Sequence, residues 1–189
     1  MRYSEDHKAK THQMILDEAA RRFRADGVGA TGLQPLMKSL GLTHGGFYAH
    51  FKSKDALVEA SLQHAVTQLK TSLAAQTGPD APLAQFIETY LSSQHRANPG
   101  HGCPLPTVSA ELGQKGQPSA TTDQLIKSWL ASISSKLPGD EAGEESVMIL
   151  SAMVGALLLS RSVTDPALSD ELLNGTRDQL LKQVDAADR

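Results

Sequence analysis

The stretch that most constrains this chain is residues 31–54, TGLQPLMKSLGLTHGGFYAHFKSK. Four of its apolar residues recur at the i, i+3, i+4 and i+7 spacing of one helix face, and these are Leu33, Leu36, Met37 and Leu40. Gly41 follows, and glycine commonly ends a helix because it accepts the left-handed backbone conformation. Thr43 can cap a second helix by accepting a hydrogen bond from a free amide. The stretch therefore predicts two short helices joined by a tight turn.

The start of the first of these helices is open to two interpretations, because Pro35 follows Gln34. Proline disfavours helical geometry at the residue before it. Either the helix starts at Pro35 as its first residue, or it has an imperfect first turn that Thr31 caps.

Two short helices with a glycine turn form the helix-turn-helix arrangement, whose second helix enters the major groove of DNA with its N-terminus first. At the start of that helix, Thr43 and His44 offer donors and acceptors short enough to reach base edges, and Gly45 lets the backbone come close. Tyr48 and His50 carry groups that suit phosphate oxygens. The residue types therefore predict binding to double-stranded DNA.

Lys54 lies in the first turn of a longer helix for which Ser53 is a suitable N-cap. The helix dipole disfavours a cation at this end. A DNA phosphate would resolve the conflict, because helix N-termini and lysine both bind anions. We therefore expect Lys54 to hold the DNA backbone.

The segment GLTHGGFYAHFKSKDAL resembles the DNA-binding signature of the tetracycline-repressor (TetR) family, and the resemblance continues upstream through ILDEAARRFRADGVGATGL. This family implies an all-α fold, with an N-terminal three-helix DNA-binding domain and a C-terminal helical domain for ligand binding and dimerisation. We expect the first domain over residues 8–68, with the motif at about 31–50, and the second over 69–189. The resemblance also implies a repressor that holds a palindromic operator as a homodimer until an effector releases it.

Charge is divided unevenly along the chain. Residues 1–54 carry nine Lys/Arg against five Asp/Glu, whereas residues 55–189 carry nine against sixteen, within a net charge of −3. A basic N-terminal third on an acidic body fits a polyanionic partner that is met by one end only. The 40% content of hydrophobic residues argues against disorder.

Helical periodicity continues on both sides of the motif. Residues 1–10 predict a mobile polar arm, followed by a helix from Lys10 to Asp26 with Arg21, Arg22 and Arg24 outside its apolar stripe. Near the C-terminus, residues 147–163 are apolar round most of the helix circumference, so we expect burial on more than one side. A partner subunit would cover the second side; the alternative is a central helix of a monomer.

Cys103 is the only cysteine, which excludes an intramolecular disulfide and a multi-cysteine zinc site. It precedes an expected helix start and lies near His101, and both features would lower the pKa of its thiol. The resemblance implies a sensor of electrophiles or oxidants, since some family members sense reactive species through a cysteine in this region. The alternative is a small buried hydrophobe. No further ligand cluster supports a metal site at this pair.

Three aromatic residues in the second domain, Phe86, Tyr90 and Trp129, suggest the lining of a small-molecule effector pocket. At helical spacing such residues are more often plain core. We expect no cofactor, no membrane span and a cytoplasmic protein, because no apolar stretch approaches the ~20 residues that a span needs. Two other functions remain as alternatives: an enzyme with Cys103 as nucleophile and His101 as base, and a helical protein-interaction module without specific DNA binding.

Overall fold

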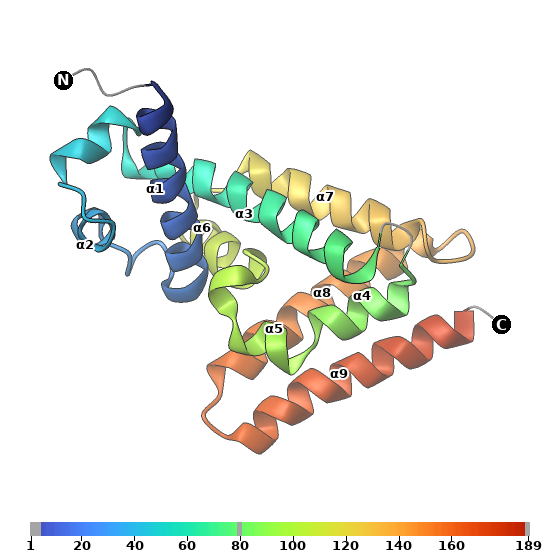
Figure 1. The fold of residues 1–189 in the computed structure, drawn as a ribbon. Coiled ribbons are helices and arrows are strands. Elements are labelled where there is room, and N and C mark those ends of the chain that lie inside the picture. The colour runs from blue at the N-terminus through green and yellow to red at the C-terminus, as the bar shows by residue number, and fades with distance from the viewer. Residues whose placement is uncertain (1–4, 79–80, 188–189) are drawn as a thin grey trace.

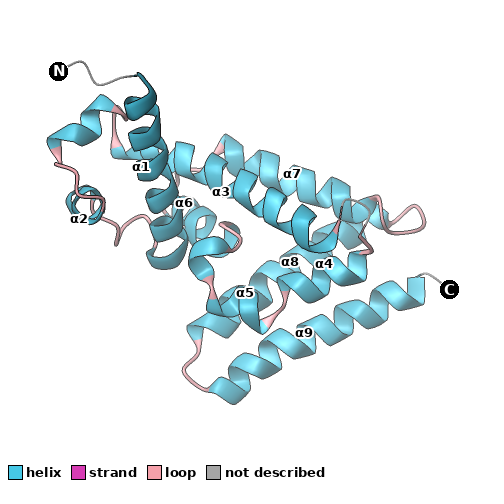
Figure 2. Cartoon of the chain, viewed as in Figure 1, coloured by secondary structure: helices cyan, strands magenta, loops and turns pink. Residues whose placement is uncertain are grey.

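The regular structure of the described residues, 5–78 and 81–187, is helical throughout in this computed structural model (Figures 1 and 2). A small head contains α1 (Glu5–Asp26), α2 (Leu33–Ser39), the short 3₁₀ helix η1 (Gly45–Ala49) and the first half of α3 (Lys54–Thr77). The all-α class and the N-terminal helix-turn-helix domain are thus confirmed. We call residues 5–62 the head and the remainder the body.

The body is a bundle in which α8 packs against both α7 and α9. Its longer helices are α4 (Leu83–Tyr90), α7 (Ala120–Ser134), α8 (Ala142–Ser162) and α9 (Pro166–Ala187). Between α4 and α7 the chain makes four short elements: α5 (Ser93–Ala97), η2 (Pro99–His101), the π-helical turn η3 (Leu105–Ser109) and α6 (Ala110–Gln114). Figure 1 shows this short-element segment lying between α1 and the long helices of the body.

Two hydrophobic clusters divide the molecule, and α3 passes through both. Leu57, Val58 and Leu62 of α3 belong to the head cluster, whereas Val66 and Leu69 belong to the body cluster. Two residues from η3 and α6, Val108 and Leu112, are buried in the head cluster. The domain boundary at residue 68 stays a prediction, and the body contributes side chains to the core of the head.

The first helix begins earlier than the sequence suggested. α1 starts at Glu5, so residues 5–10 are helical and the expected mobile arm is wrong for them; residues 1–4 lie outside the described part of the chain. Glu5 and Asp6 favour the helix N-terminus through the dipole, and Asp6 pairs with Lys10 at 3.2 Å. Local charges therefore extend the helix beyond its apolar stripe.

α8 is long and apolar enough to cross a membrane by length and composition, which the sequence analysis did not expect. Its packing gives a different explanation of the same composition. One face is buried through residues such as Ile149, Met153 and Leu157, while Val147, Leu158 and Leu159 of another face are exposed. α8 is thus a core helix with one uncovered apolar side.

Candidate nucleic-acid interface and effector pocket

The turn between α2 and η1 has the geometry that the glycine predicted. Gly41 has φ +71°, its amide donates to the Lys38 carbonyl at 3.1 Å, and the Leu42 amide donates to the Met37 carbonyl at 2.9 Å. These are the two hydrogen bonds of a Schellman motif. Leu42 then packs on the head cluster, which fixes the angle at which the chain enters η1.

Neither interpretation of the start of α2 is correct. The helix begins at Leu33, and the Leu36 amide donates to the Gly32 carbonyl at 3.1 Å. Pro35 is the third helical residue, where an amide has no intrahelical acceptor, so the missing N–H costs no hydrogen bond. Thr31 does not cap α2, because its hydroxyl donates to the Gly27 carbonyl at 2.8 Å.

The second helix of the motif is shorter than a regular α-helix. η1 is a five-residue 3₁₀ helix whose N-cap residue is His44 rather than Thr43, although Thr43 Oγ1 accepts from the Gly46 amide at 3.2 Å. Two successive glycines disfavour a longer helix. Phe47 is fully buried and stacks on Phe51 with ring centroids 5.8 Å apart. This ring anchors η1 to the head.

The residues predicted to reach base edges share the exposed side of this turn. Thr43, His44 and Gly45 are all exposed, and Tyr48 is 60% exposed. The His44 and Tyr48 rings meet edge to face at 5.8 Å. η1 therefore presents hydrogen-bonding groups outward and its phenylalanine inward.

His50 is placed differently, because it is only partly exposed and faces α1. Its ring lies 6.1 Å from that of His12, and its Nδ1 is enclosed without a hydrogen-bond partner among the described residues. Burial lowers the pKa of His50, and the nearby His12 and Lys8 lower it further. His12 and Lys8 thus add basic groups beside His50, and sequence reasoning missed His12.

Lys54 already has an acceptor within the protein. Its Nζ donates to the Val28 carbonyl at 2.7 Å, while Ser53 Oγ accepts from the Ala56 amide at 3.0 Å, the capping role predicted for it. An ammonium group has three donors. Lys54 can therefore keep this bond and still donate to a phosphate, which stays a prediction.

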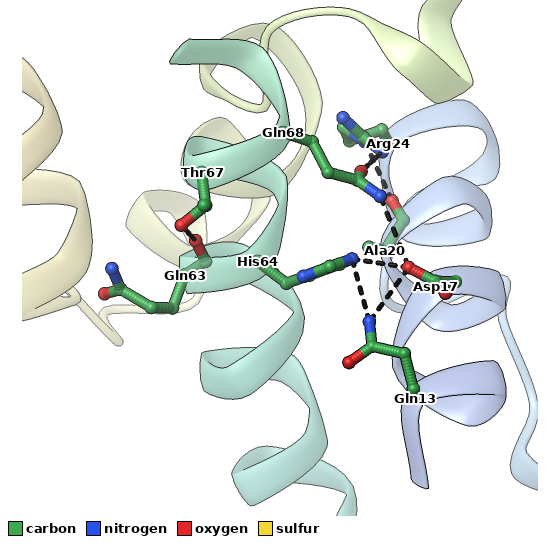
Figure 3. A network of polar contacts seen from close by, with 8 residues as sticks. All are labelled: Gln13, Asp17, Ala20, Arg24, Gln63, His64, Thr67 and Gln68. Atoms are coloured by element: carbon green, nitrogen blue, oxygen red, sulfur yellow. Dashed lines mark hydrogen bonds and ion pairs between the residues drawn. The ribbon is translucent and has the colours of Figure 1, made fainter. Parts of the chain in front are cut away.

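A polar seam joins α1 to α3 (Figure 3). Asp17 Oδ1 contacts His64 Nε2 at 2.5 Å and accepts from Gln68 Nε2 at 3.3 Å. The Gln68 carbonyl oxygen in turn accepts from Arg24 Nη2 at 2.7 Å. The relative position of the first and third helices is therefore set by hydrogen bonds as well as by apolar packing.

The expectation that Arg24 lies outside the buried stripe is wrong. The residue is 2% exposed, and its Nη1 reaches the Gly102 carbonyl of the body at 3.3 Å. Its Nε donates to the Ala20 carbonyl at 3.0 Å. Burial lowers the pKa of Arg24 to about 10. Arg24 thus connects α1, α3 and the body. Ala20 lies one helical turn before Arg24 on the buried face of α1, so its position could have indicated that Arg24 is buried too.

A second polar link joins the head to the body, and here the charged group is an anion of the body that accepts from the head. The carboxylate of Glu111 in α6 accepts from the Val28 amide at 2.6 Å and from the Gly29 amide at 2.7 Å. Lys115 also donates to it, at 2.5 Å. Burial alone would raise the pKa of Glu111, but these three hydrogen bonds outweigh it and hold the pKa below its ordinary value.

The structure contradicts the expected lowering of the Cys103 pKa. The thiol is 1% exposed, and burial raises its pKa to about 11. Its neighbour is His95 rather than His101: His95 Nε2 accepts from the Cys103 amide at 3.0 Å, while His101 is exposed. Cys103 is therefore a buried neutral thiol, and its sulfur accepts from the Leu105 amide at 3.4 Å.

The three aromatic residues gather in the body core. Trp129 packs edge to face on Phe86 at 5.5 Å and on Tyr90 at 5.6 Å. Phe86 and Trp129 also line a cavity of about 340 Å³, and Tyr90 lines a separate pocket of about 560 Å³. The cluster forms one wall for both spaces, so the structure does not bring the three residues into a single pocket.

Comparison with known proteins agrees with this architecture. The family model described as "Bacterial regulatory proteins, tetR family" matches residues 15–61. YxaF, an uncharacterised HTH-type transcriptional regulator of Bacillus subtilis (strain 168), is 25% identical over 84% of this chain and 88% of its own. The HTH-type transcriptional regulator LmrA of the same strain is 26% identical over 79% of this chain and 86% of its own.

Among solved structures, a TetR-family transcriptional regulator from Cytophaga hutchinsonii has a TM-score of 0.75 at 22% identity, covering 97% of this chain and 98% of that chain. The fold, the exposed face of η1 and these relatives together define a helix-turn-helix transcriptional regulator. Residues 15–61 match the TetR family, as the motif predicted.

Proposed function

We propose that this protein is a repressor that binds a palindromic operator as a homodimer and leaves it when an effector binds. The exposed face of η1 carries the proposal, because it places Thr43, His44 and Gly45 outward around a buried Phe47. These three residues would contact base edges, and Tyr48, His50 and Lys54 would contact the DNA backbone.

The uncovered side of α8 and α9 supports the homodimer. Val147, Met148, Leu158 and Leu159 of α8 and Leu168 of α9 are large exposed hydrophobic residues. A Cβ added at Gly155 of α8 or Gly175 of α9 would meet nothing within 4 Å in the described structure, so a second pair of helices has room to approach there. Two heads would then contact half-sites about one helical turn, ~34 Å, apart.

Selection of binding sites from random duplex DNA tests this function. We expect a palindrome to be enriched, and His44→Ala to change the base preference within each half-site. Lys54→Ala should instead weaken binding to all sequences alike and reduce the slope of log affinity against log salt by about 1, because it removes one phosphate contact.

If the selection profile of His44→Ala were unchanged, His44 would not be one of the residues that contact base edges. If no sequence were enriched and binding did not fall with salt, a protein-interaction module would replace the DNA-binding regulator. The TetR family is usually not enzymatic, and the buried Cys103 lacks the exposure that a nucleophile needs. We propose the cytoplasm as the location, since operator DNA lies there.

A further inference from the structure

The pocket beside the segment 92–102 has an unusual combination of lining groups. It measures about 560 Å³ and lies between the later part of α3, the end of α4 and this segment. Leu69 and Leu73 of α3 give it an apolar part, whereas His95 and most other lining residues are polar. Its volume lies in the range of small-molecule sites.

Two buried donors, one in the pocket lining and one directly behind it, lack a good acceptor. Tyr90 lines the pocket and is 1% exposed, and its hydroxyl makes no well-formed hydrogen bond among the described residues; it lies beside the thiol of Cys103, a weak acceptor. Arg161 lies behind the wall, since a Cβ added at Gly102 would be 3.5 Å from its Nη2. This Nη2 donates to the His95 carbonyl at 2.5 Å, and Nη1 has no hydrogen-bond partner among the described residues. The Tyr90 ring packs on the His95 ring at 4.8 Å, so His95 brings the two groups together. Buried donors without acceptors are costly, and a ligand acceptor would remove that cost.

The charge around this wall is positive. In the part of the chain that the structure describes, neither Arg24 nor Arg161 has a carboxylate within 4.0 Å; their partners are carbonyl oxygens and the Gln68 amide. Burial, with Arg161 adding to it, lowers the pKa of His95 to about 4. The acidic residue of the pocket lining is Glu88, which is exposed. Buried cations without a counter-ion favour an anionic ligand.

We propose that this pocket binds a small organic anion with an aliphatic part, such as a carboxylic acid. Its carboxylate would accept hydrogen bonds from the Tyr90 hydroxyl and Arg161 Nη1, and its chain would pack against Leu69 and Leu73. This inference rests on the proposed function, since it gives the effector a chemical class. The link from Arg24 to the Gly102 carbonyl places the head in contact with the same wall.

The test uses straight-chain carboxylates from butanoate to octanoate as probes, each beside the amide of equal length. Calorimetric titration of the purified full-length protein should detect the acids and not the amides. Tyr90→Phe removes only a hydroxyl whose neighbour is the weakly accepting Cys103 thiol, so we expect a nearly unchanged melting temperature and a loss of carboxylate affinity of about tenfold or more. Arg161→Gln should weaken binding further, whereas Arg177→Gln on α9 is a matched control that should bind normally.

Equal affinity for acids and amides, or full carboxylate affinity in Tyr90→Phe, would overturn the proposal. Operator binding is measured in parallel without any probe, so that failure of DNA binding is recognised separately from failure of the ligand site. Release of the operator by a carboxylate, and its loss in Tyr90→Phe, would support the anion as the class of effector. Carboxylate binding without any change in operator affinity would overturn the effector role.

Discussion

The two links between head and body use opposite chemistry. Arg24 is a buried cation of the head that donates to a carbonyl of the body, at Gly102. Glu111 is a partly buried anion of the body that accepts from two amides of the head, at Val28 and Gly29. The first link ends on the wall of the 560 Å³ pocket, whereas none of the three residues of the second lines that pocket.

The difference shows two ways of holding one interface. Burial of Arg24 carries a desolvation cost, which appears as a lowered pKa, and neutral acceptors offset that cost only in part. The hydrogen bonds to Glu111 more than compensate its burial and favour the charged carboxylate. We therefore expect the stability contribution of the Arg24 link to depend on the positions of its acceptors. We expect that of the Glu111 link to depend on whether the carboxylate is ionised, and so on pH.

The largest effect is expected from Arg24→Ala. It leaves the Gly102 carbonyl and the Gln68 amide without their buried donor and opens a cavity, so we expect a loss of about 3 kcal/mol in the free energy of unfolding. Arg24→Met keeps much of the volume and should cost about half as much. Denaturant unfolding measures both variants. A loss below about 0.5 kcal/mol in either would contradict a stabilising role for this link.

A smaller effect is expected at the turn that Glu111 holds. Gly27 has φ +87°, and an added Cβ would lie 2.9 Å from Glu111 Oε2. Gly27→Ala should therefore cost about 2 kcal/mol, through backbone strain and displacement of the carboxylate. Gly116→Ala is the matched control, because Gly116 has φ +65° and open space around it. Equal thermal destabilisation of the two variants would show that strain alone accounts for the cost.

The smallest effect is expected from Glu111→Gln, at about 1 kcal/mol at neutral pH, because the amide keeps one acceptor oxygen. The pKa of Glu111 is lower in the folded state, so its contribution is present above the ordinary carboxyl value of 4.5 and is lost as the pH falls through the folded pKa. Unfolding curves of the wild type and this variant should converge in acid. The penalty of Arg24→Met should stay constant over the same range, and a parallel decline would erase the distinction between the links.

Local sequence signals predicted the motif well, because each signal and its partner lie within a few residues. The hydrogen bonds around Gly41 reach only to Met37 and Lys38, so the turn followed from one glycine and its neighbours. The outward position of Thr43 and His44 followed from the same stretch, but the 3₁₀ geometry did not, although the glycine pair indicated a weak helix.

The links between head and body could not be predicted from the sequence, because their partners lie far apart along the chain. Arg24 and Gly102 are 78 residues apart, and Glu111 and Val28 are 83 apart. Periodicity assigns a residue to a face but does not identify the distant group that covers it. For Cys103, proximity in sequence suggested His101, whereas α5 brings His95 against it. The chemistry of the pocket wall therefore depends on tertiary packing.

The brevity of η1 has a consequence for the time that the protein spends on DNA. This turn is held by a few short-range hydrogen bonds and by the buried ring of Phe47. If Gly45 contacts a base edge as proposed, fixing it there would cost more conformational entropy than fixing any other residue type. Such a cost would weaken operator binding, and differences in affinity between related complexes lie mostly in the dissociation rate, so we expect fast dissociation. Short residence times would let operator occupancy follow a changing effector concentration closely.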